Sequence, residues 1–200
     1  MSAVWESELR EAFQFKKGMI FLDVGAHIGR YTLRAGKIVG KYGKVLSIEP
    51  CLTNYNLLVE NIRLNKLQNC FAFNIAAYSK NAELVLFRGE DSAKNSLKED
   101  SGKGYYKVKA RALDNVLSEA GIDNVDLIKI DVEGAEYEVL KGLEQTLISG
   151  NPKLMVEILR KDKEKVKCYL NSLGFKDKLL HSSINYKEGI FYYIFKKKKS

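Results

Sequence analysis

Short apolar runs alternate along the chain with longer amphipathic stretches. The apolar runs have the length and composition of buried β-strands, and they cover residues 19–23, 45–49, 70–77, 125–131 and 154–159. The stretches between them carry helical periodicity or helix-capping residues, and they cover residues 28–39, 53–65, 113–120, 135–148 and 162–173. Strands that alternate with helices predict an α/β protein with a doubly wound, mostly parallel sheet and helices on both faces.

The end of the chain and one internal segment depart from this alternation. Residues 175–180 and 190–195 have the pattern of a final strand pair, and their short connection predicts an antiparallel strand at the end of a seven-stranded sheet. Residues 83–110 contain two alternating stretches around a polar loop, which predicts an inserted hairpin-like segment. An imperfect amphipathic pattern over residues 4–16 predicts a leading helix. Because the chain has no linker and no internal repeat, we expect a single domain over residues 1–200.

Two glycines and two carboxylates stand where the first two predicted strands end. Asp23 ends the first apolar run, Gly25 and Gly29 follow it, and Glu49 ends the second run. Glycines let the backbone approach a ligand closely, and the N–H groups of the following helix face that ligand. An acid at the end of the second strand can accept hydrogen bonds from both hydroxyls of a ribose. The pattern therefore predicts a ligand that contains adenosine.

The spacing of the glycines favours one adenosine ligand over another. A dinucleotide fingerprint reads G-x-G-x-x-G, whereas Ala26 and His27 here separate only two glycines, so the pyrophosphate cradle is incomplete. An acid at Asp23, two residues before the first glycine, suits a ligand with an ammonium group. S-adenosylmethionine carries an amine, a sulfonium and a ribose but no phosphate. The pair of Asp23 and Glu49 therefore favours S-adenosylmethionine over NAD.

Four segments resemble the FkbM-type methyltransferases, which depend on S-adenosylmethionine. They are D-V-G-A-H-I-G-R-Y-T at 23–32, I-E-P with N-x-x-L-L-x-E-N-I-x-L-N at 48–65, A-R-A-L-D at 110–114, and L-I-K-I-D-V-E-G-A-E at 127–136. The likeness covers roughly residues 18–159, and its last segment is the most specific. The resemblance implies a Rossmann-like class I methyltransferase fold, S-adenosylhomocysteine as the product, and usually a hydroxyl oxygen as the methyl acceptor. It leaves open whether the acceptor is a small molecule, a sugar or a lipid-linked compound.

The resemblance and the strand ends together imply a set of cofactor-binding residues. We expect Asp23 to face the methionine end of the cofactor, directly or through water, and Glu49 to bind the ribose. Pro50 and Asn54 shape the loop after Glu49, and residues 74–76 border the adenine at the end of the third strand. The predicted cofactor-binding residues are Asp23, Gly25, Ala26, His27, Gly29, Tyr31, Glu49, Pro50, Asn54, Asn74, Ala76 and Asp131.

Three carboxylates are candidates for catalysis. Asp131 and Glu133 follow the fourth strand, where Asp131 can reach the amine of the cofactor or the acceptor hydroxyl. Glu133 either acts on the acceptor or caps the helix that follows. Glu157 lies in an apolar strand, where a carboxylate needs a partner or a task, so it is a candidate to orient the acceptor or act as a base. These three residues and His181 could hold a divalent cation, but no metal-ligand spacing is present, and we predict no metal site.

The inserted segment offers side chains for an acceptor pocket. Ser92, Asn95, Ser96 and Tyr105 are polar or aromatic residues within it or at its loop. A surface loop with no such role is nearly as good an interpretation. The sequence pattern does not decide between the two.

Composition places the chain among globular proteins of a reducing compartment. It has 200 residues, of which 46% are hydrophobic, and no apolar run reaches the roughly 18–20 residues of a membrane span. The start M-S-A-V-W-E-S-E lacks the pattern of a secretory signal. Cys51, Cys70 and Cys168 form no C-x-x-C pair, which favours unpaired thiols over a disulfide framework. We therefore expect a cytoplasmic protein, and the sequence does not indicate its oligomeric state.

The uneven distribution of charge along the chain is compatible with further functions. Residues 1–150 hold 20 Lys or Arg and 20 Asp or Glu, whereas residues 151–200 hold 13 and 5. A basic region attracts polyanions, so an RNA methyltransferase is a second interpretation, although a solvated basic face is the more ordinary explanation. The absence of an N-P-P-Y motif favours a ribose oxygen over an exocyclic amine in that case. An NAD-dependent oxidoreductase and a non-catalytic protein with the same fold also stay open.

Overall fold

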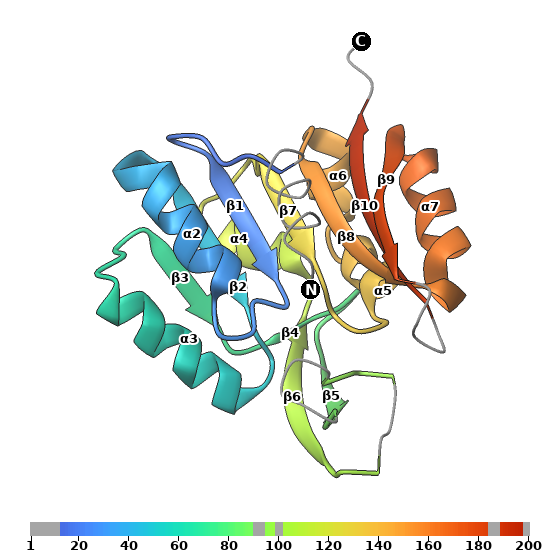
Figure 1. The fold of residues 1–200 in the computed structure, drawn as a ribbon, viewed down its shortest axis with the longest axis horizontal. Coiled ribbons are helices and arrows are strands. Elements are labelled where there is room, and N and C mark those ends of the chain that lie inside the picture. Colours follow the sequence, from blue (N-terminus) through green and yellow to red (C-terminus); the bar gives the residue numbers. More distant parts are fainter. Residues whose placement is uncertain (1–12, 90–94, 99–101, 184–188, 198–200) are drawn as a thin grey trace.

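Seven strands form one sheet within residues 13–89, 95–98, 102–183 and 189–197, which the computed structural model describes. They lie in the order β3–β2–β1–β7–β8–β10–β9 (Figure 1). The strands are β1 (Ile20–Val24), β2 (Lys44–Ile48), β3 (Cys70–Phe73), β7 (Leu127–Ile130), β8 (Lys153–Leu159), β9 (Phe175–Ser183) and β10 (Ile190–Lys197). Strand β10 pairs antiparallel with β8 and β9, and the other pairings are parallel. The predicted seven-stranded, mostly parallel sheet with an antiparallel carboxyl-terminal strand is confirmed.

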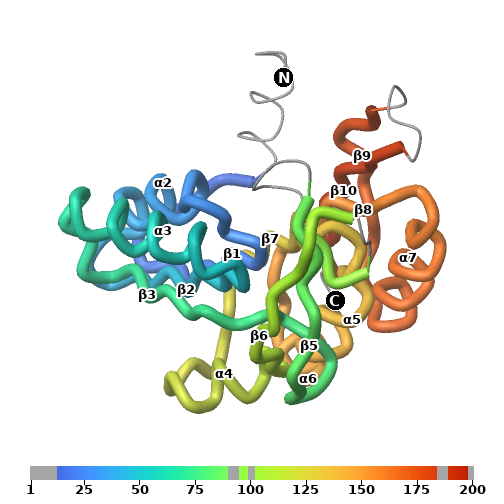
Figure 2. The backbone as a smooth tube through the Cα atoms, turned by 90° about the horizontal axis from the view of Figure 1, so that it is seen from below, coloured from blue at the N-terminus to red at the C-terminus, as the bar shows by residue number. Residues whose placement is uncertain are grey.

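Helices cover both faces of this sheet, as predicted. They are α2 (Arg30–Val39), α3 (Leu52–Leu64), α4 (Leu113–Glu119), α5 (Glu136–Lys141), α6 (Glu144–Ser149) and α7 (Lys163–Ser172), with short 3-10 helices η1 (Gly40–Tyr42) and η2 (Arg160–Asp162). Helices α2 and α3 lie on one face, and α4 lies on the other (Figure 2). Successive strand residues point to opposite faces. Phe21 and Leu127 therefore pack with residues of α2, and Leu22 and Ile128 with residues of α4, α5, α6 and α7.

The inserted segment forms a second, smaller sheet. Strands β4 (Ala76–Ala77), β5 (Ala82–Phe87) and β6 (Tyr105–Arg111) lie in the order β4–β6–β5, with β5 and β6 antiparallel. The predicted third strand, 70–77, is therefore wrong in extent, because β3 ends at Phe73 and β4 belongs to the smaller sheet. The Asn74 side chain donates hydrogen bonds to the carbonyls of Glu49 (2.9 Å) and Pro50 (3.0 Å). These bonds hold the chain where it leaves the main sheet.

The predicted helix over 135–148 is also wrong in extent, since α5 and α6 are separated at Gly142. The Gly142 carbonyl accepts a hydrogen bond from the Asp114 N–H (2.9 Å). The Asp114 carboxylate accepts from the N–H groups of Gln145 (2.8 Å) and Thr146 (3.0 Å) at the start of α6. A Cβ at Gly142 would lie 2.0 Å from the carbonyl oxygen of Tyr78. Tight packing and a capping residue from another helix thus divide the stretch.

The predicted leading helix, 4–16, falls mostly on residues outside the described part of the chain. Its last residues, 13–16, are irregular rather than helical. Phe13 and Phe15 are buried against Phe21 of β1, with edge-to-face ring contacts of 5.8 and 4.9 Å between centroids. Their apolar character therefore reflects packing on the sheet, on the α2 face.

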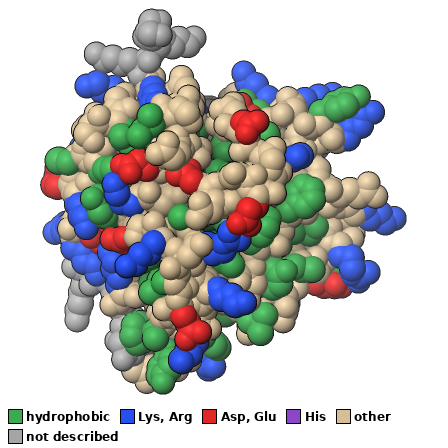
Figure 3. Space-filling model, turned by 180° about the vertical axis from the view of Figure 1, so that it is seen from behind, with side chains coloured by type: hydrophobic (Ala, Val, Ile, Leu, Met, Phe, Trp, Pro, Cys, Tyr) green, Lys and Arg blue, Asp and Glu red, His purple; other side chains and the backbone are tan. Residues whose placement is uncertain are grey.

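One face of the molecule mixes charges of both signs (Figure 3). On the face in Figure 3, Lys and Arg side chains lie among Asp and Glu side chains and among exposed hydrophobic ones. Exposed apolar side chains on α3 and β3 include Leu57 (50%), Leu64 (62%) and Phe71 (46%). Among the described helices, none combines the length and hydrophobicity needed to cross a bilayer.

Candidate active site

The carboxyl ends of β1 and β7 meet where the order of strands reverses. Strand β1 pairs with β2 on one side and with β7 on the other. Ligands of open α/β sheets bind at the carboxyl ends of strands beside such a reversal. The glycine turn follows β1, Asp131 follows β7, and Glu157 lies near the end of the next strand, β8. The fold thus places the predicted residues of three separate segments at one edge.

The turn after β1 depends on both of its glycines. Gly25 and Gly29 have φ values of 77° and 96°, which L side chains rarely adopt. A Cβ at Gly25 would lie 1.8 Å from the backbone oxygen of Asp131, and one at Gly29 would lie 2.6 Å from the side chain of Leu58. The N–H groups of Gly25 and Ala26 both donate to the carbonyl of Ile48 (3.0 Å each). The turn is therefore packed between the ends of β2 and β7.

Glu49 connects the end of β2 to the glycine turn. Its buried carboxylate accepts hydrogen bonds from the N–H groups of His27 (2.8 Å) and Cys51 (3.0 Å), and Asn54 lies 3.5 Å away. Burial raises the pKa of Glu49, and these hydrogen bonds act in the opposite direction. A carboxylate has about four lone-pair directions, so acceptor capacity remains for hydroxyl groups. His27 itself has φ 52° and contributes to this contact through its backbone.

Asp23 lies beneath the turn rather than at the surface. Its side chain has no exposed area, and one of its oxygens accepts a hydrogen bond from Thr32 of α2 (2.7 Å). Thr32 in turn lies 2.7 Å from the hydroxyl of Ser47, which must be the donor because the Thr32 proton is already engaged. Burial raises the pKa of Asp23. In this arrangement Asp23 reaches a ligand only through the groups that surround it.

Lys129 is a buried residue of this region to which the sequence pattern assigned no role. Its ammonium group lies 3.1 Å from a carboxylate oxygen of Asp131 and 3.7 Å from one of Asp23. It also donates a hydrogen bond to the carbonyl of Gly25 (3.1 Å) and lies 5.4 Å from the ring centre of Tyr31. The signal in the sequence was a lysine between two isoleucines of an apolar strand, since a buried charge requires partners.

The three predicted catalytic carboxylates lie together. One oxygen each of Asp131, Glu133 and Glu157 falls within a group whose members are at most 4.8 Å apart. Burial and the neighbouring Asp131 raise the pKa of Glu157 well above its ordinary value, while a hydrogen bond from Tyr192 of β10 opposes this rise. Glu133 has φ 52°, a left-handed conformation that is strained for this residue. Such a group can take up a proton, and its oxygens also suit a hard divalent cation.

His181 lies apart from the three carboxylates, and the N-cap position of α5 is occupied by Ala135. His181 lies on β9 beyond Tyr192, with 6.1 Å between their ring centres, and is not a member of the carboxylate group found among the described residues. Helix α5 starts at Glu136 without a side-chain cap on its N-cap residue, Ala135, in the described structure. Glu136 instead accepts a hydrogen bond from the Gly134 N–H (2.8 Å) and so closes the turn after Glu133.

The remaining predicted cofactor residues surround the same edge. Tyr31 is half-buried on α2 beside Lys129, and Asn54 is buried beside Glu49. Pro50 is held by Asn74 through its carbonyl. Ala76 is buried in β4 and belongs to the same apolar cluster as Cys51. Pro50, Asn54 and Ala76 therefore lie around the loop after β2, where the resemblance places the adenosine end of the cofactor, and Tyr31 lies beside Lys129.

The inserted segment contacts the loop after β7 through Ser96. Its buried hydroxyl donates a hydrogen bond to the carbonyl of Glu133 (2.7 Å). Asn95 accepts a hydrogen bond from the Gly89 N–H (3.1 Å), within the insertion. Tyr105 is 63% exposed, and Ser92 falls outside the described residues. Ser96 thus has a direct contact with a predicted catalytic residue.

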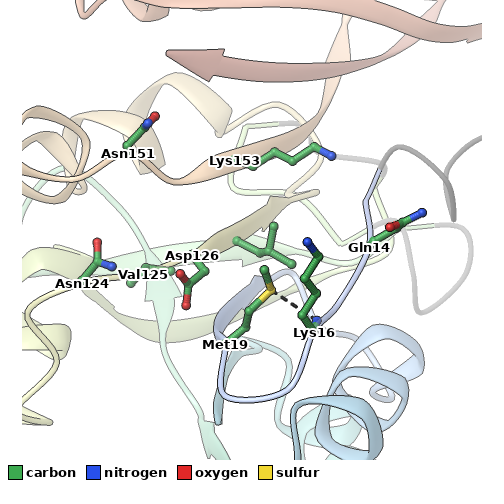
Figure 4. Close-up of a pocket in the computed structure, with 9 residues that line it drawn as sticks. Gln14, Lys16, Met19, Asn124, Val125, Asp126, Asn151 and Lys153 are labelled. Atoms are coloured by element: carbon green, nitrogen blue, oxygen red, sulfur yellow. Dashed lines mark hydrogen bonds between the residues drawn. The ribbon is translucent and has the colours of Figure 1, made fainter. Parts of the chain in front are cut away.

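A pocket of about 340 Å³ lies at the opposite edge of the sheet (Figure 4). It is formed at the amino ends of β1, β7 and β8, where Met19, Asp126 and Lys153 line it. Its lining among the described residues includes no predicted site residue. Parallel strands bind ligands at their carboxyl ends, so this pocket is separate from the candidate active site.

Comparison with known sequences gives the family. The model of the methyltransferase FkbM domain matches residues 23–179. Methyltransferase sdnD from Sordaria araneosa is 30% identical over 161 residues, which cover 62% of this chain and 60% of sdnD. The 2-O-methyltransferase NoeI from Sinorhizobium fredii is 48% identical over 44 residues, which cover 22% of this chain and 18% of NoeI. The family model therefore matches well over half of the chain.

The fold agrees with this match. The crystal structure of methyltransferase FkbM from Methylobacillus flagellatus KT superposes with a TM-score of 0.68 and 18% identity, and it covers 92% of this chain. The chain spans 45% of that protein and 60% of sdnD, so it is shorter than both. The glycine turn, the acid after β2 and the segment L-I-K-I-D-V-E-G-A-E all fall within the matched residues. This chain belongs to the FkbM family of S-adenosylmethionine-dependent methyltransferases.

Proposed function

We propose that this protein methylates a hydroxyl oxygen of a small molecule, a sugar or a lipid-linked acceptor. The observation that carries the proposal is the group of Asp131, Glu133 and Glu157, whose oxygens lie within 4.8 Å of one another. Asp131 and Glu133 come from the loop after β7 and Glu157 comes from β8, and they lie beside the glycine turn. A hydroxyl is a weak nucleophile, and carboxylates at this place can remove its proton.

The residues at the edge of the sheet fit S-adenosylmethionine. Gly25 and Gly29 allow a tight turn at this edge, because a Cβ at either position would collide with neighbouring protein atoms, and Glu49 keeps acceptor capacity for the two ribose hydroxyls. Asp131 is half-buried and can accept a hydrogen bond from the ammonium group of the methionine end. When bound, S-adenosylmethionine supplies an electrophilic methyl group on its sulfonium.

The three carboxylates have different roles at the acceptor, namely its orientation and the removal of its proton. Glu157, with its raised pKa and its contact with Tyr192, keeps a proton to a higher pH than an ordinary glutamate and orients the acceptor by hydrogen bonding. Asp131 or Glu133 accepts the proton of the acceptor hydroxyl and passes it to water. The insertion positions this loop through the hydrogen bond from Ser96 to the Glu133 carbonyl.

A hydroxyl acceptor agrees with one named relative, the 2-O-methyltransferase NoeI. A ribose hydroxyl of RNA is the second candidate acceptor, and the observation that favours it is the set of exposed lysines on β9 and β10, Lys176, Lys178 and Lys196. The carboxylate group weighs against it, because three acids near the acceptor repel phosphates. We therefore place the small-molecule acceptor first.

Transfer of a labelled methyl group tests the proposal. The protein is incubated with S-adenosylmethionine labelled on its methyl group and with a panel of sugars, polyols, glycolipids and RNA. We expect the label in a hydroxylated compound of low charge, with Glu133→Gln reducing turnover by about 10²-fold or more. The matched control, Glu83→Gln on the exposed part of β5, should leave turnover unchanged. Label in RNA alone would favour the second candidate, and cofactor binding without transfer to any acceptor would favour a non-catalytic protein.

A further inference from the structure

Lys129 is a buried charge that the proposed chemistry does not use. Its side chain is 6% exposed and lies on the α2 face of β7 between two apolar neighbours, Ile128 and Ile130. The ammonium group contacts groups from two strands, namely Asp23 and the Gly25 carbonyl on the β1 side and Asp131 on the β7 side. Among the described residues, it is the side chain that links these two strand ends by charge.

Packing alone does not explain this lysine. Removing two charges from water costs free energy that a well-packed apolar side chain would avoid, so a buried ion pair is weak evidence for stability. Asp131 and Asp23 together raise the pKa of Lys129 above its ordinary value despite burial, so the residue stays protonated. Its geometry serves another purpose, because the contacted groups lie at the end of β1, in the turn after β1 and in the loop after β7, around the proposed cofactor site.

We propose that Lys129 is a positioning residue for the methionine end of the cofactor. Its ammonium group holds the Gly25 carbonyl and the Asp131 carboxylate in a fixed relation, so that the turn after β1 and the loop after β7 present their groups together. Asp23 acts through Lys129 by balancing its charge from below. The inference rests on the proposed binding of S-adenosylmethionine at this edge.

The contacts divide the site into two halves. The turn and the β7 loop touch each other at Gly25, whose added Cβ would lie 1.8 Å from the Asp131 oxygen, and Lys129 spans this contact. The carboxylate of Glu49 is held directly by His27, Cys51 and Asn54, and the charge of Lys129 acts on it more weakly, opposing the rise that burial causes in the pKa of Glu49. Loss of Lys129 should therefore weaken binding of the amino-acid half of the cofactor and spare the adenosine half.

Binding to the two halves of the site can be compared with two ligands. S-adenosylhomocysteine carries the amino-acid group, whereas 5′-methylthioadenosine has the same adenosine and thioether without it. Lys129→Met by itself leaves Asp23 as an unpaired buried charge and lowers stability whatever its role in binding. The informative protein is therefore the double variant Asp23→Asn with Lys129→Met, which removes both charges of the buried pair. Its reference is Asp23→Asn alone, which keeps Lys129 beside Asp131.

Calorimetric titration of the double variant gives the decisive comparison. We expect the Kd for S-adenosylhomocysteine to rise at least about tenfold relative to Asp23→Asn, and the Kd for methylthioadenosine to stay within about twofold. The thermal midpoint of the double variant should exceed that of Lys129→Met. Lys167→Met, which removes an ion pair with Asp177 (3.0 Å) on α7 and β9, should change neither Kd.

Two results would overturn the inference in different ways. An unchanged Kd for S-adenosylhomocysteine, or an equal loss for both ligands, would mean that Lys129 has no positioning role or only a structural one. Failure of the unmodified protein to bind either ligand would overturn the proposed cofactor site itself and the inference with it. The unmodified protein thus tells the two failures apart.

Discussion

Glu136 is a buried carboxyl group whose charge changes near neutral pH. One oxygen accepts the Gly134 N–H, and the other has no hydrogen-bond partner among the described residues. Burial raises the pKa of Glu136 to about 7, and the nearby carboxylates of Asp162 and Asp131 add to this rise. Because the folded state then binds its proton more tightly than the unfolded state, stability is highest below the unfolded pKa and falls as pH rises towards about 7.

Glu136→Gln should remove this loss. The glutamine keeps an oxygen for the Gly134 N–H but cannot ionise. We expect the variant to gain stability relative to the unmodified protein between pH 5 and pH 8, by up to about 3 kcal/mol. Urea unfolding at the two pH values measures the difference, with Glu83→Gln as an exposed control. Parallel pH dependence in the unmodified protein and Glu136→Gln would contradict the account.

Gly25 is required both by its backbone conformation and by its neighbours. Gly25→Ala adds a Cβ at φ 77° and brings it 1.8 Å from the Asp131 oxygen, which is backbone and cannot move aside easily. We expect a loss of about 2–4 kcal/mol in the free energy of unfolding. Gly121→Ala is the matched control, since Gly121 has φ 64° but nothing within 4 Å of an added Cβ, and it should cost about 1 kcal/mol. Equal losses of unfolding free energy in Gly25→Ala and Gly121→Ala would show that the collision of the added Cβ with the Asp131 oxygen has no energetic cost.

Among the elements, the insertion and the loop after β7 are joined by a hydrogen bond from Ser96. Its hydroxyl donates to the Glu133 carbonyl and also accepts the Lys98 N–H (3.1 Å). Ser96→Ala should raise hydrogen exchange at the amides of residues 131–134 by about fivefold, as expected for the loss of one hydrogen bond of about 1 kcal/mol. The affinity for S-adenosylhomocysteine should change less than about threefold, and exposed Ser118→Ala serves as control. Unchanged hydrogen exchange in residues 131–134 would show that Ser96 of the insertion does not stabilise the loop after β7.

Sequence patterns predicted most elements because each depends on its own residues. The buried strands follow from short apolar runs, and the inserted hairpin follows from alternation in β5 and β6. The break between α5 and α6 could not be predicted in this way, because it depends on Asp114, which is 31 residues away from Gln145 in the chain. The end of β3 depends likewise on the contacts of Asn74 with the loop after β2.

The same limit applies to the candidate site, where residues at strand ends could be predicted but contacts between distant segments could not. Glycines and acids at strand ends were visible in the sequence, and Asp131, Glu133 and Glu157 do lie together. What the pattern did not reveal is the network beneath them. The contacts of Lys129 join residues more than 100 positions apart, such as Gly25, and arise only once β1 and β7 pair.

At the scale of the whole molecule, the net charge of +8 comes from the carboxyl-terminal quarter. Lysines exposed on β9 and β10 attract polyanions without selecting a sequence. We expect weak RNA binding that falls by about 10²-fold or more between about 50 and about 200 mM salt. Filter binding of a short RNA, with and without S-adenosylhomocysteine, measures this. Binding that resists salt and strengthens with the cofactor would favour RNA as the acceptor.

The central claim is that the carboxyl edge of β1, β2 and β7 binds S-adenosylmethionine. The most direct test is calorimetric titration of the protein with S-adenosylhomocysteine and with NAD, alongside Glu49→Ala and the exposed control Glu60→Ala. We expect that S-adenosylhomocysteine binds, that NAD does not, and that Glu49→Ala alone weakens binding by about tenfold or more. Binding of NAD without S-adenosylhomocysteine, or equal affinity in Glu49→Ala, would contradict it.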